Sequence, residues 1–214
     1  MKKIVLIGDS IRMGYDKYVK EALADVAEVY YPLENARYST NLLRFLHEWK
    51  DKGEWPTDAD LVHWNVGLWD AVELFGDDPL TPIEYYEKNI KRIYNRIKQL
   101  FPNAKQVFAT STAGLEHRFV ANARRTNASI QNYNEAAKRA LADTDVIIND
   151  LFSLTVSCPE EYHSDAVHFN TDAGRELIGG RVISVICKML DIPATEVNIE
   201  NFEPENYSAA NIGY

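Results

Sequence analysis

Apolar residues gather in five short runs along the chain, and longer segments with helical spacing of apolar positions lie between them. The runs are rich in Val and Ile, or alternate apolar with polar residues, and they span 3–7, 26–31, 60–65, 105–110 and 145–149. Runs of this kind predict β-strands. In 82–100 apolar residues recur every three or four positions until Phe101-Pro102-Asn103, which predicts an amphipathic helix that stops there. Similar spacing predicts helices over 11–24, 39–51, 127–142 and 171–190.

Strands that alternate with helices predict a parallel sheet, and right-handed crossovers place the helices on both of its faces. We therefore expect an α/β fold, a three-layer α/β/α sandwich around a five-stranded parallel sheet. No repeat or Gly/Ser linker divides the chain of 214 residues, so residues 1–190 are expected to form one domain. Ligands of open parallel sheets bind beyond the carboxyl ends of the strands, which directs attention to the residues that follow each strand.

Residues 191–214 differ from the rest of the chain. They are acidic, lack periodicity and contain two Pro, which fits either a frayed terminus or an extended arm packed on the body or on a second subunit. Their apolar side chains favour packing and leave a homodimer possible; they are Ile199, Phe202, Tyr207, Ile212 and Tyr214.

Charge and cysteine content narrow the possible partners. Lys and Arg number 23 against 32 Asp and Glu, a formal charge of −9, which disfavours nucleic acid and anionic membranes as partners. Cys158 and Cys187 are too few for a disulfide framework. The apolar run Ile4-Val5-Leu6-Ile7 is too short for a signal peptide, and no apolar stretch is long enough to span a membrane. A cytoplasmic location is the expectation.

The first strand ends in Gly8-Asp9-Ser10 and leads into a helix. This position places the Ser10 hydroxyl and backbone N–H at a helix N-terminus, where developing negative charge is favoured, and suits a nucleophile. The alternative is that Asp9 or Ser10 serves only as the N-cap of the helix.

A second polar site is the loop Asp165-Ala166-Val167-His168, just before the last helix, which Asn170 or Thr171 can cap. A carboxylate three residues before an imidazole can accept its Nδ1–H and leave Nε2 to take a proton from a hydroxyl. Alone, the pattern is more typical of a surface loop. Paired with Ser10, it would complete a nucleophile, a base and an orienting acid at one edge of the sheet.

The third site follows the third strand and reads Trp64-Asn65-Val66-Gly67-Leu68-Trp69-Asp70. Asn65 offers a side-chain N–H donor to an oxyanion, and Gly67 lets the backbone approach one closely. Asn and Gly are also common turn residues, so a simple turn is the alternative.

Together these motifs resemble those of the SGNH hydrolase superfamily, the GDSL esterases and lipases. The resemblance covers residues 3 to about 190 and rests on Gly8-Asp9-Ser10 and on Asp165 with His168. It implies a flavodoxin-like sheet, Ser10 as nucleophile, His168 as general base and Asp165 as its orienting acid. It further implies an oxyanion hole made by the Ser10 N–H, a glycine N–H after the second strand and an asparagine side chain after the third.

Two departures from the family pattern affect the oxyanion hole. No Gly occurs in 34–40, so a backbone N–H of Ala36, Arg37 or Tyr38 must substitute, and we take Arg37. In Gly67-Leu68-Trp69-Asp70 a Trp stands where the family has its Asn, so Asn65 is the replacement. Substrate contacts are expected from Asp9, Gly67, Trp69 and Tyr38.

The connection over 111–126 is long and is expected to overhang the site as a specificity element. Its His117, Arg118, Arg124 and Arg125 could attract a carboxylate-bearing substrate, or could pair with local Glu as surface charge. Four aromatic residues could provide a platform for a sugar ring or pack in the core; they are Tyr38, Trp64, Trp69 and Phe75.

These observations predict a serine esterase, without metal or cofactor, that removes a small acyl group, an O-acetyl, from a small carbohydrate ester. The same groups would serve an acyltransferase, and the altered oxyanion motifs leave an inactive carbohydrate-binding relative as a further alternative. A metal-dependent phosphoesterase is a third class, which would use acidic and histidine side chains at the same edge, namely Asp9, Asp70, His163, Asp165 and His168.

Overall fold

Five parallel strands form the central sheet in the order β2-β1-β3-β5-β7. The computed structural model describes residues 1–203. The strands are β1 (Lys2–Ile7), β2 (Ala27–Tyr30), β3 (Leu61–Trp64), β5 (Lys105–Ala109) and β7 (Ile147–Asn149). Each lies within one residue or two of a predicted run, so the five-stranded parallel sheet is confirmed.

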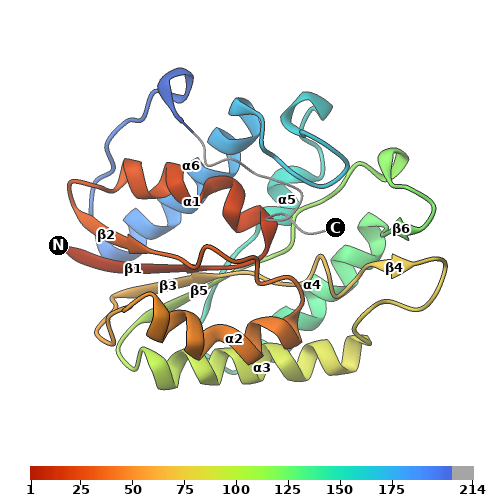
Figure 1. Ribbon diagram of the computed structural model, residues 1–214, viewed down its shortest axis with the longest axis horizontal. Helices are drawn as coiled ribbons and strands as arrows, with labels where there is room; N and C mark the ends of the chain where they lie inside the picture. Colours follow the sequence, from red (N-terminus) through yellow and green to blue (C-terminus); the bar gives the residue numbers. More distant parts are fainter. Residues whose placement is uncertain (204–214) are drawn as a thin grey trace.

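Helices cover both faces of this sheet (Figure 1). The long helices are α1 (Ser10–Ala22), α2 (Ser39–Lys52), α3 (Ile83–Leu100), α4 (Asn127–Leu141) and α6 (Asp172–Leu190). Side chains alternate across a strand, so Ile4 and Leu6 of β1 pack with α1 and α6, whereas Val5 and Ile7 pack with α2 and α3. The three-layer α/β/α sandwich is therefore confirmed. None of the helices within residues 1–203 has both the length and the apolar character to cross a membrane.

Side-chain caps fix where three of the long helices begin. Asp9 accepts a hydrogen bond from the Ile11 N–H at the start of α1, and Thr126 and Thr171 accept one from the third residue beyond each at α4 and α6. Such caps satisfy N–H groups that a helix leaves without partners. Asp9 thus is an N-cap, one of the roles that the sequence left open, and Thr171 is the cap of the last helix.

A small second sheet lies beyond the carboxyl ends of the central strands, on the right in Figure 1. It consists of β4 (Glu73–Leu74), from the connection after β3, and the antiparallel β6 (Ala123–Arg124), from the connection after β5. A backbone hydrogen bond of 3.0 Å from Phe75 N to Asn122 O extends the pairing. We refer to residues 72–80 and 118–125 together as the flap. The sequence pattern did not predict this sheet, nor the short helix α5 (Leu151–Thr155).

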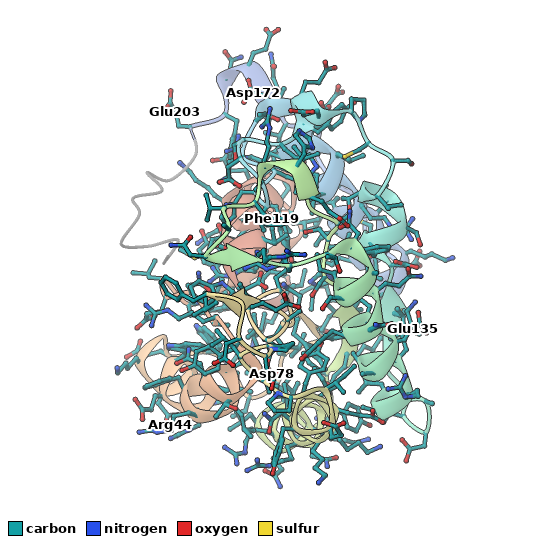
Figure 2. All side chains as sticks on the ribbon, turned by 90° about the vertical axis from the view of Figure 1, so that its right-hand side faces the viewer. Arg44, Asp78, Phe119, Glu135, Asp172 and Glu203 are labelled. Carbon is teal, nitrogen blue, oxygen red and sulfur yellow. The ribbon has the colours of Figure 1, made fainter. Side chains whose placement is uncertain are left out.

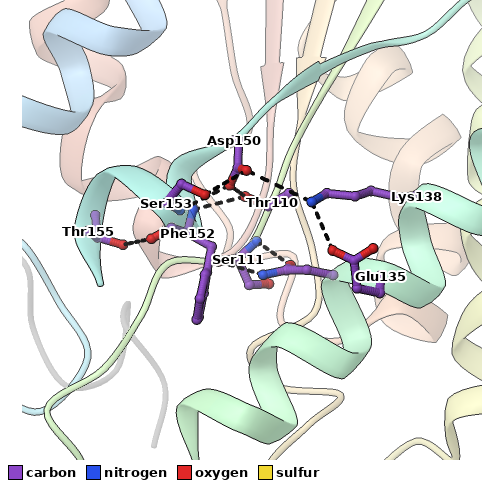
Figure 3. Close-up of polar contacts among 9 residues, drawn as sticks. Thr110, Ser111, Glu135, Lys138, Asp150, Phe152, Ser153 and Thr155 are labelled. Atoms are coloured by element: carbon purple, nitrogen blue, oxygen red, sulfur yellow. Dashed lines mark hydrogen bonds and ion pairs between the residues drawn. The ribbon is translucent and has the colours of Figure 1, made fainter. Parts of the chain in front are cut away.

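The long connection after β5 is anchored where it leaves the strand (Figure 3). The Thr110 hydroxyl lies 3.2 Å from Asp150 Oδ1 and accepts the Phe152 N–H at 3.0 Å. Ser111 exchanges two hydrogen bonds with the Asn134 side chain, at 2.8 and 3.0 Å. These contacts hold the first residues of the connection against α4 and α5. The rest of the connection therefore starts from a fixed position at the carboxyl edge of the sheet.

The described part of the predicted tail, residues 191–203, lies against α1. Thr195 N donates to Ala22 O at 2.8 Å, and the Phe202 ring meets the Tyr18 ring edge-on, with centroids 5.5 Å apart. Tyr207, Ile212 and Tyr214 lie outside the described residues. The division into a domain over 1–190 and a tail over 191–214, on the body or a second subunit, stays a prediction.

Candidate active site

Ser10, His168 and Asp165 form a chain of hydrogen bonds at the carboxyl edge of the sheet. His168 Nε2 lies 2.8 Å from Ser10 Oγ, and His168 Nδ1 lies 2.7 Å from Asp165 Oδ2. Ser10 is the first residue of α1, while the other two come from the loop before α6. Two segments at opposite ends of the sequence are thus brought together in the order hydroxyl, imidazole, carboxylate. This arrangement can move a proton from the hydroxyl to the imidazole.

The Asp165 carboxylate is held by its own loop. Its Oδ1 accepts the N–H groups of Val167 and His168, at 2.7 and 2.8 Å, which leaves Oδ2 for the imidazole. Burial raises the pKa of Asp165, but the hydrogen bonds and charge of His168 outweigh it, and the pKa lies well below its ordinary value. An ionised Asp165 favours the tautomer with hydrogen on Nδ1, so Nε2 faces Ser10 as a proton acceptor.

Asp9 precedes Ser10 and is the N-cap of α1. It is fully buried, and its Oδ1 accepts from Ile11 N at 3.0 Å and from Asn65 Nδ2 at 2.8 Å. Burial raises the pKa of Asp9, and the bonds from Asn65 and Ile11 oppose this rise. Asp9 therefore joins the start of α1 to the segment after β3, and its predicted contact with substrate stays a prediction.

Asn65 packs against the backbone of Gly8. A Cβ on Gly8 would lie 1.9 Å from Asn65 Oδ1, far inside contact distance, so only glycine allows Asn65 to take this position. Asn65 is 1% exposed. One hydrogen of its amide nitrogen binds Asp9, and within residues 1–203 the other has no acceptor. Its role as an oxyanion donor stays a prediction.

Two of the three candidate N–H groups in the segment after β2 already donate hydrogen bonds within the protein. Ala36 N donates to Gly8 O at 3.0 Å, and Arg37 N donates to Asn35 Oδ1 at 2.7 Å. Arg37 has a φ of 55°, a left-handed conformation that favours glycine. Tyr38 N–H, just before α2, has no acceptor among the described residues. The oxyanion role predicted for Arg37 is untested. Its backbone N–H already donates a hydrogen bond to Asn35, whereas the N–H of Tyr38 does not donate one to the described residues.

Gly67 and Asp70 shape the backbone after β3. Gly67 has a φ of 148°, and a Cβ there would lie 2.7 Å from Ser111 Oγ, so close packing requires glycine. Asp70 accepts the Ser39 hydroxyl at 2.6 Å and the Ser39 N–H at 2.9 Å. Burial raises the pKa of Asp70 to about 6, although the hydrogen bonds from Ser39 act to lower it. Asp70 thus ties the start of α2 to this segment, a positioning role that sequence reasoning missed.

A cavity of about 470 Å³ opens at Ser10 and His168. Of the predicted site residues, Ser10, Asp165, His168 and Trp69 line it, whereas Asp9, Asn65, Gly67, Arg37 and Tyr38 do not. The connection over 111–126 also forms part of its wall, as expected of an overhanging element, and contributes Arg118, Phe119, Val120, Ala123 and Arg125. Figure 2 looks onto this side of the molecule, with Phe119 near the middle of the face.

Three of the four basic residues of this connection pair with nearby carboxylates. Arg118 and His117 both contact Glu160, and Arg124 lies 3.9 Å from Glu73. This is the surface-charge alternative that the sequence left open. The pair of Arg118 and Glu160 also links the connection to the segment that leads to His168.

The four aromatic residues considered as a sugar platform do not lie together. Trp64 is fully buried and packs on Phe108, with ring centroids 4.7 Å apart, so it belongs to the core. Phe75 is 83% exposed on the flap, and only Trp69 lines the cavity. For the metal alternative, residues 1–203 contain no group of three or more His, Cys, Asp or Glu side chains arranged to hold an ion.

No protein-family model matches this sequence, and no curated protein matches it either. Solved structures do share its fold. A lipase/acylhydrolase from Enterococcus faecalis superposes with a TM-score of 0.69 at 20% identity, over 92% of this chain and 100% of that one. An acetyl xylan esterase gives 0.65 at 18% identity, over 86% and 99%. A GDSL-like lipase from Bacteroides thetaiotaomicron gives 0.61 at 16% identity, over 87% and 88%. The chain therefore has the fold of these hydrolase structures, as its resemblance to the SGNH superfamily implied.

Proposed function

We propose that this chain is a serine ester hydrolase that works through an acyl-enzyme intermediate. The observation that carries the proposal is the chain of hydrogen bonds from Ser10 through His168 to Asp165, which opens on a cavity. A hydroxyl bonded to an imidazole that is itself held by a carboxylate is the arrangement that activates a serine. The shared fold with lipases and esterases supports the same reaction class.

In the first half of the reaction, Ser10 Oγ attacks the carbonyl carbon of the ester while His168 Nε2 takes the hydroxyl proton. The imidazolium that forms is stabilised by the ionised Asp165. His168 then returns the proton to the departing alcohol, and the acyl group stays on Ser10. In the second half, water loses a proton to His168 as it attacks the acyl carbon, and His168 returns this proton to Ser10 Oγ when the acid leaves.

Negative charge on the carbonyl oxygen needs donors placed before the reaction begins. The Ser10 N–H is at the first turn of α1, where the helix dipole favours an anion. The Asn65 amide and a backbone N–H in 36–38 are the proposed partners. Because this machinery acts on the carbonyl group, it does not itself set the acyl length.

The finer expectation from the sequence is an O-acetyl ester of a carbohydrate. This expectation is supported by the fold that the chain shares with an acetyl xylan esterase. Transfer of the acyl group to a sugar hydroxyl would use the same three residues. The cytoplasmic location and the homodimer likewise remain predictions.

Hydrolysis of p-nitrophenyl acetate and butyrate by wild type and Ser10→Ala tests the proposal. We expect turnover by wild type and a loss of several orders of magnitude in the variant. Ser129→Ala, on the start of α4 and away from the cavity, is the matched control and should match wild type. Equal rates in Ser10→Ala and wild type would refute the proposal.

A further inference from the structure

The lining of the cavity beside Ser10 is mainly hydrocarbon. The segment after β3 contributes Leu68 and Trp69, and the flap contributes Val72, Leu74, Leu80 and Val120. Ala166 and Val167, from the loop that carries His168, close another side. A sugar ring would need side chains that bond its hydroxyl groups, and beyond the three reacting residues the polar ones here are Trp69, Arg118 and Arg125.

The two arginines do not turn the cavity into a polar site. Arg118 is paired with Glu160, and the Arg125 guanidinium lies 5.5 Å from the centre of the Phe119 ring. Arg125 thus covers an aromatic face. An apolar group inside the cavity would leave both of these contacts in place.

Apolar side chains also continue outward from the cavity along the flap. Leu80 is 45% exposed, Val120 61% and Phe75 83%. They come from two segments that are held together by the pairing of β4 with β6 and by the bond from Phe75 N to Asn122 O. Scattered exposed apolar residues are ordinary, but a cluster around a cavity mouth marks a binding surface.

The volume is larger than an acetyl group needs. At about 470 Å³ the cavity falls within the roughly 300–1,000 Å³ of pockets that hold drug-sized ligands. Ser10 opens into it, and during the reaction the acyl group is the part that stays bonded to Ser10, whereas the alcohol must leave and be replaced by water. The acyl part of the ester is therefore the occupant that this space fits.

We infer that the flap and the segment after β3 form a binding site for an apolar acyl chain longer than acetyl. This inference rests on the proposed ester hydrolase function. It replaces the expectation of a small acyl group and makes the flap residues Leu74, Leu80 and Ala123 the determinants of acyl length.

A series of p-nitrophenyl esters from acetate through butyrate and hexanoate to octanoate tests the site. Each methylene that enters an apolar site contributes about 0.8 kcal/mol, so kcat/KM should rise about four-fold per methylene until the cavity is full. A parallel series of alkyl acetates, from methyl to hexyl, should show no such rise. A flat or falling acyl series, or a rise confined to the alkyl acetates, would overturn the inference.

Two variants change the site in opposite directions. Leu80→Ala removes part of the wall and should lower kcat/KM for hexanoate relative to acetate by about four- to ten-fold. Ala123→Leu adds bulk inside the cavity and should lower the octanoate to acetate ratio by about ten-fold. Ile147→Ala is the control, because Ile147 is an isomer of leucine on β7 that is 42% exposed, much like Leu80, and does not line the cavity. This variant should show the same dependence of kcat/KM on acyl length as the wild type. Ratios unchanged in both flap variants would overturn the inference.

The outcomes separate the two proposals. If no ester is hydrolysed above the level of Ser10→Ala, the ester hydrolase function fails and the acyl site fails with it. If esters are hydrolysed in a Ser10-dependent reaction without preference for longer acyl chains, only the acyl site fails.

Discussion

Asn65 donates a hydrogen bond of 2.8 Å from its amide nitrogen to Oδ1 of the buried Asp9, which is the N-cap of α1. Gly8 leaves room for this contact, because a Cβ there would overlap Asn65 Oδ1. The strand ends that carry Ser10 and Asn65 are thereby locked to one another. A change at Asn65 should therefore affect both the reaction and the folded state.

Asn65→Ala should lower kcat by roughly 10²–10³-fold, the usual effect of losing one oxyanion donor, with KM within a few-fold. It should also lower the free energy of unfolding by about 1–3 kcal/mol, since Asp9 loses a buried partner. Steady-state kinetics and urea unfolding on the same preparation measure both. An unchanged kcat with reduced stability would show that Asn65 only supports Asp9.

Trp69 lines the cavity and should behave differently. A side chain that touches the ground state and the transition state alike affects binding more than the chemical step. We expect Trp69→Ala to raise KM and change acyl preference, with little change in kcat. A collapse of kcat at Trp69, combined with a near-normal Asn65→Ala, would mean that the oxyanion hole is misplaced.

Two buried histidines near the site provide a matched pair, His163 at 6% and His168 at 4% exposure. His163 packs on Phe169 in a tilted arrangement, with ring centroids 4.0 Å apart, and its Nε2 lies 3.7 Å from Cys158 Sγ, whereas His168 contacts Ser10. His168→Ala should lower kcat by several orders of magnitude, and His163→Ala should leave most of it. Initial rates on p-nitrophenyl butyrate decide between them, and the reverse order would refute His168 as the base.

His63 makes stability depend on pH. It is fully buried in β3, between the Tyr15 hydroxyl at 3.5 Å and the Asn149 amide at 3.2 Å, and burial lowers its pKa from 6.5 to about 3. Below pH 6.5 the unfolded chain binds a proton on His63 that the folded chain does not bind until about pH 3. The free energy of unfolding therefore falls as pH falls through this range.

Between pH 7 and pH 5 this one group should cost the wild type about 2 kcal/mol. Urea unfolding of wild type and His63→Leu at both values isolates the effect, because other groups such as Asp70 titrate in both proteins. The wild type should lose more stability than the variant. Equal losses would show that His63 does not titrate in this way.

The sequence predicted the main sheet and the long helices because each has its own local signal. Runs of Val and Ile, apolar periodicity and the capping residues Asp9 and Thr171 act within one element. The flap gave no such signal: β4 and β6 are two residues each and pair across some fifty positions of sequence, so only the folded chain brings them together.

The site shows the same contrast. Asp165 and His168 are three residues apart in one loop, and their spacing already indicated the contact that the structure contains. The bond from Asn65 to Asp9 and the link from Asp70 to Ser39 join separate strand ends, and residue spacing carries no information about them. The same holds for the positive φ of Arg37, at a position where no glycine marks the turn.

Labelling with a fluorophosphonate, followed by mass spectrometry of the modified peptide, tests the central claim most directly. The reagent forms a stable bond only with a serine that is activated by a neighbouring base, so it reads the contact of His168 Nε2 with Ser10 Oγ without any assumption about substrate. We predict one label, on Ser10, which is lost in Ser10→Ala and strongly reduced in His168→Ala. A label on another serine, or no label on folded wild-type protein, would contradict the account.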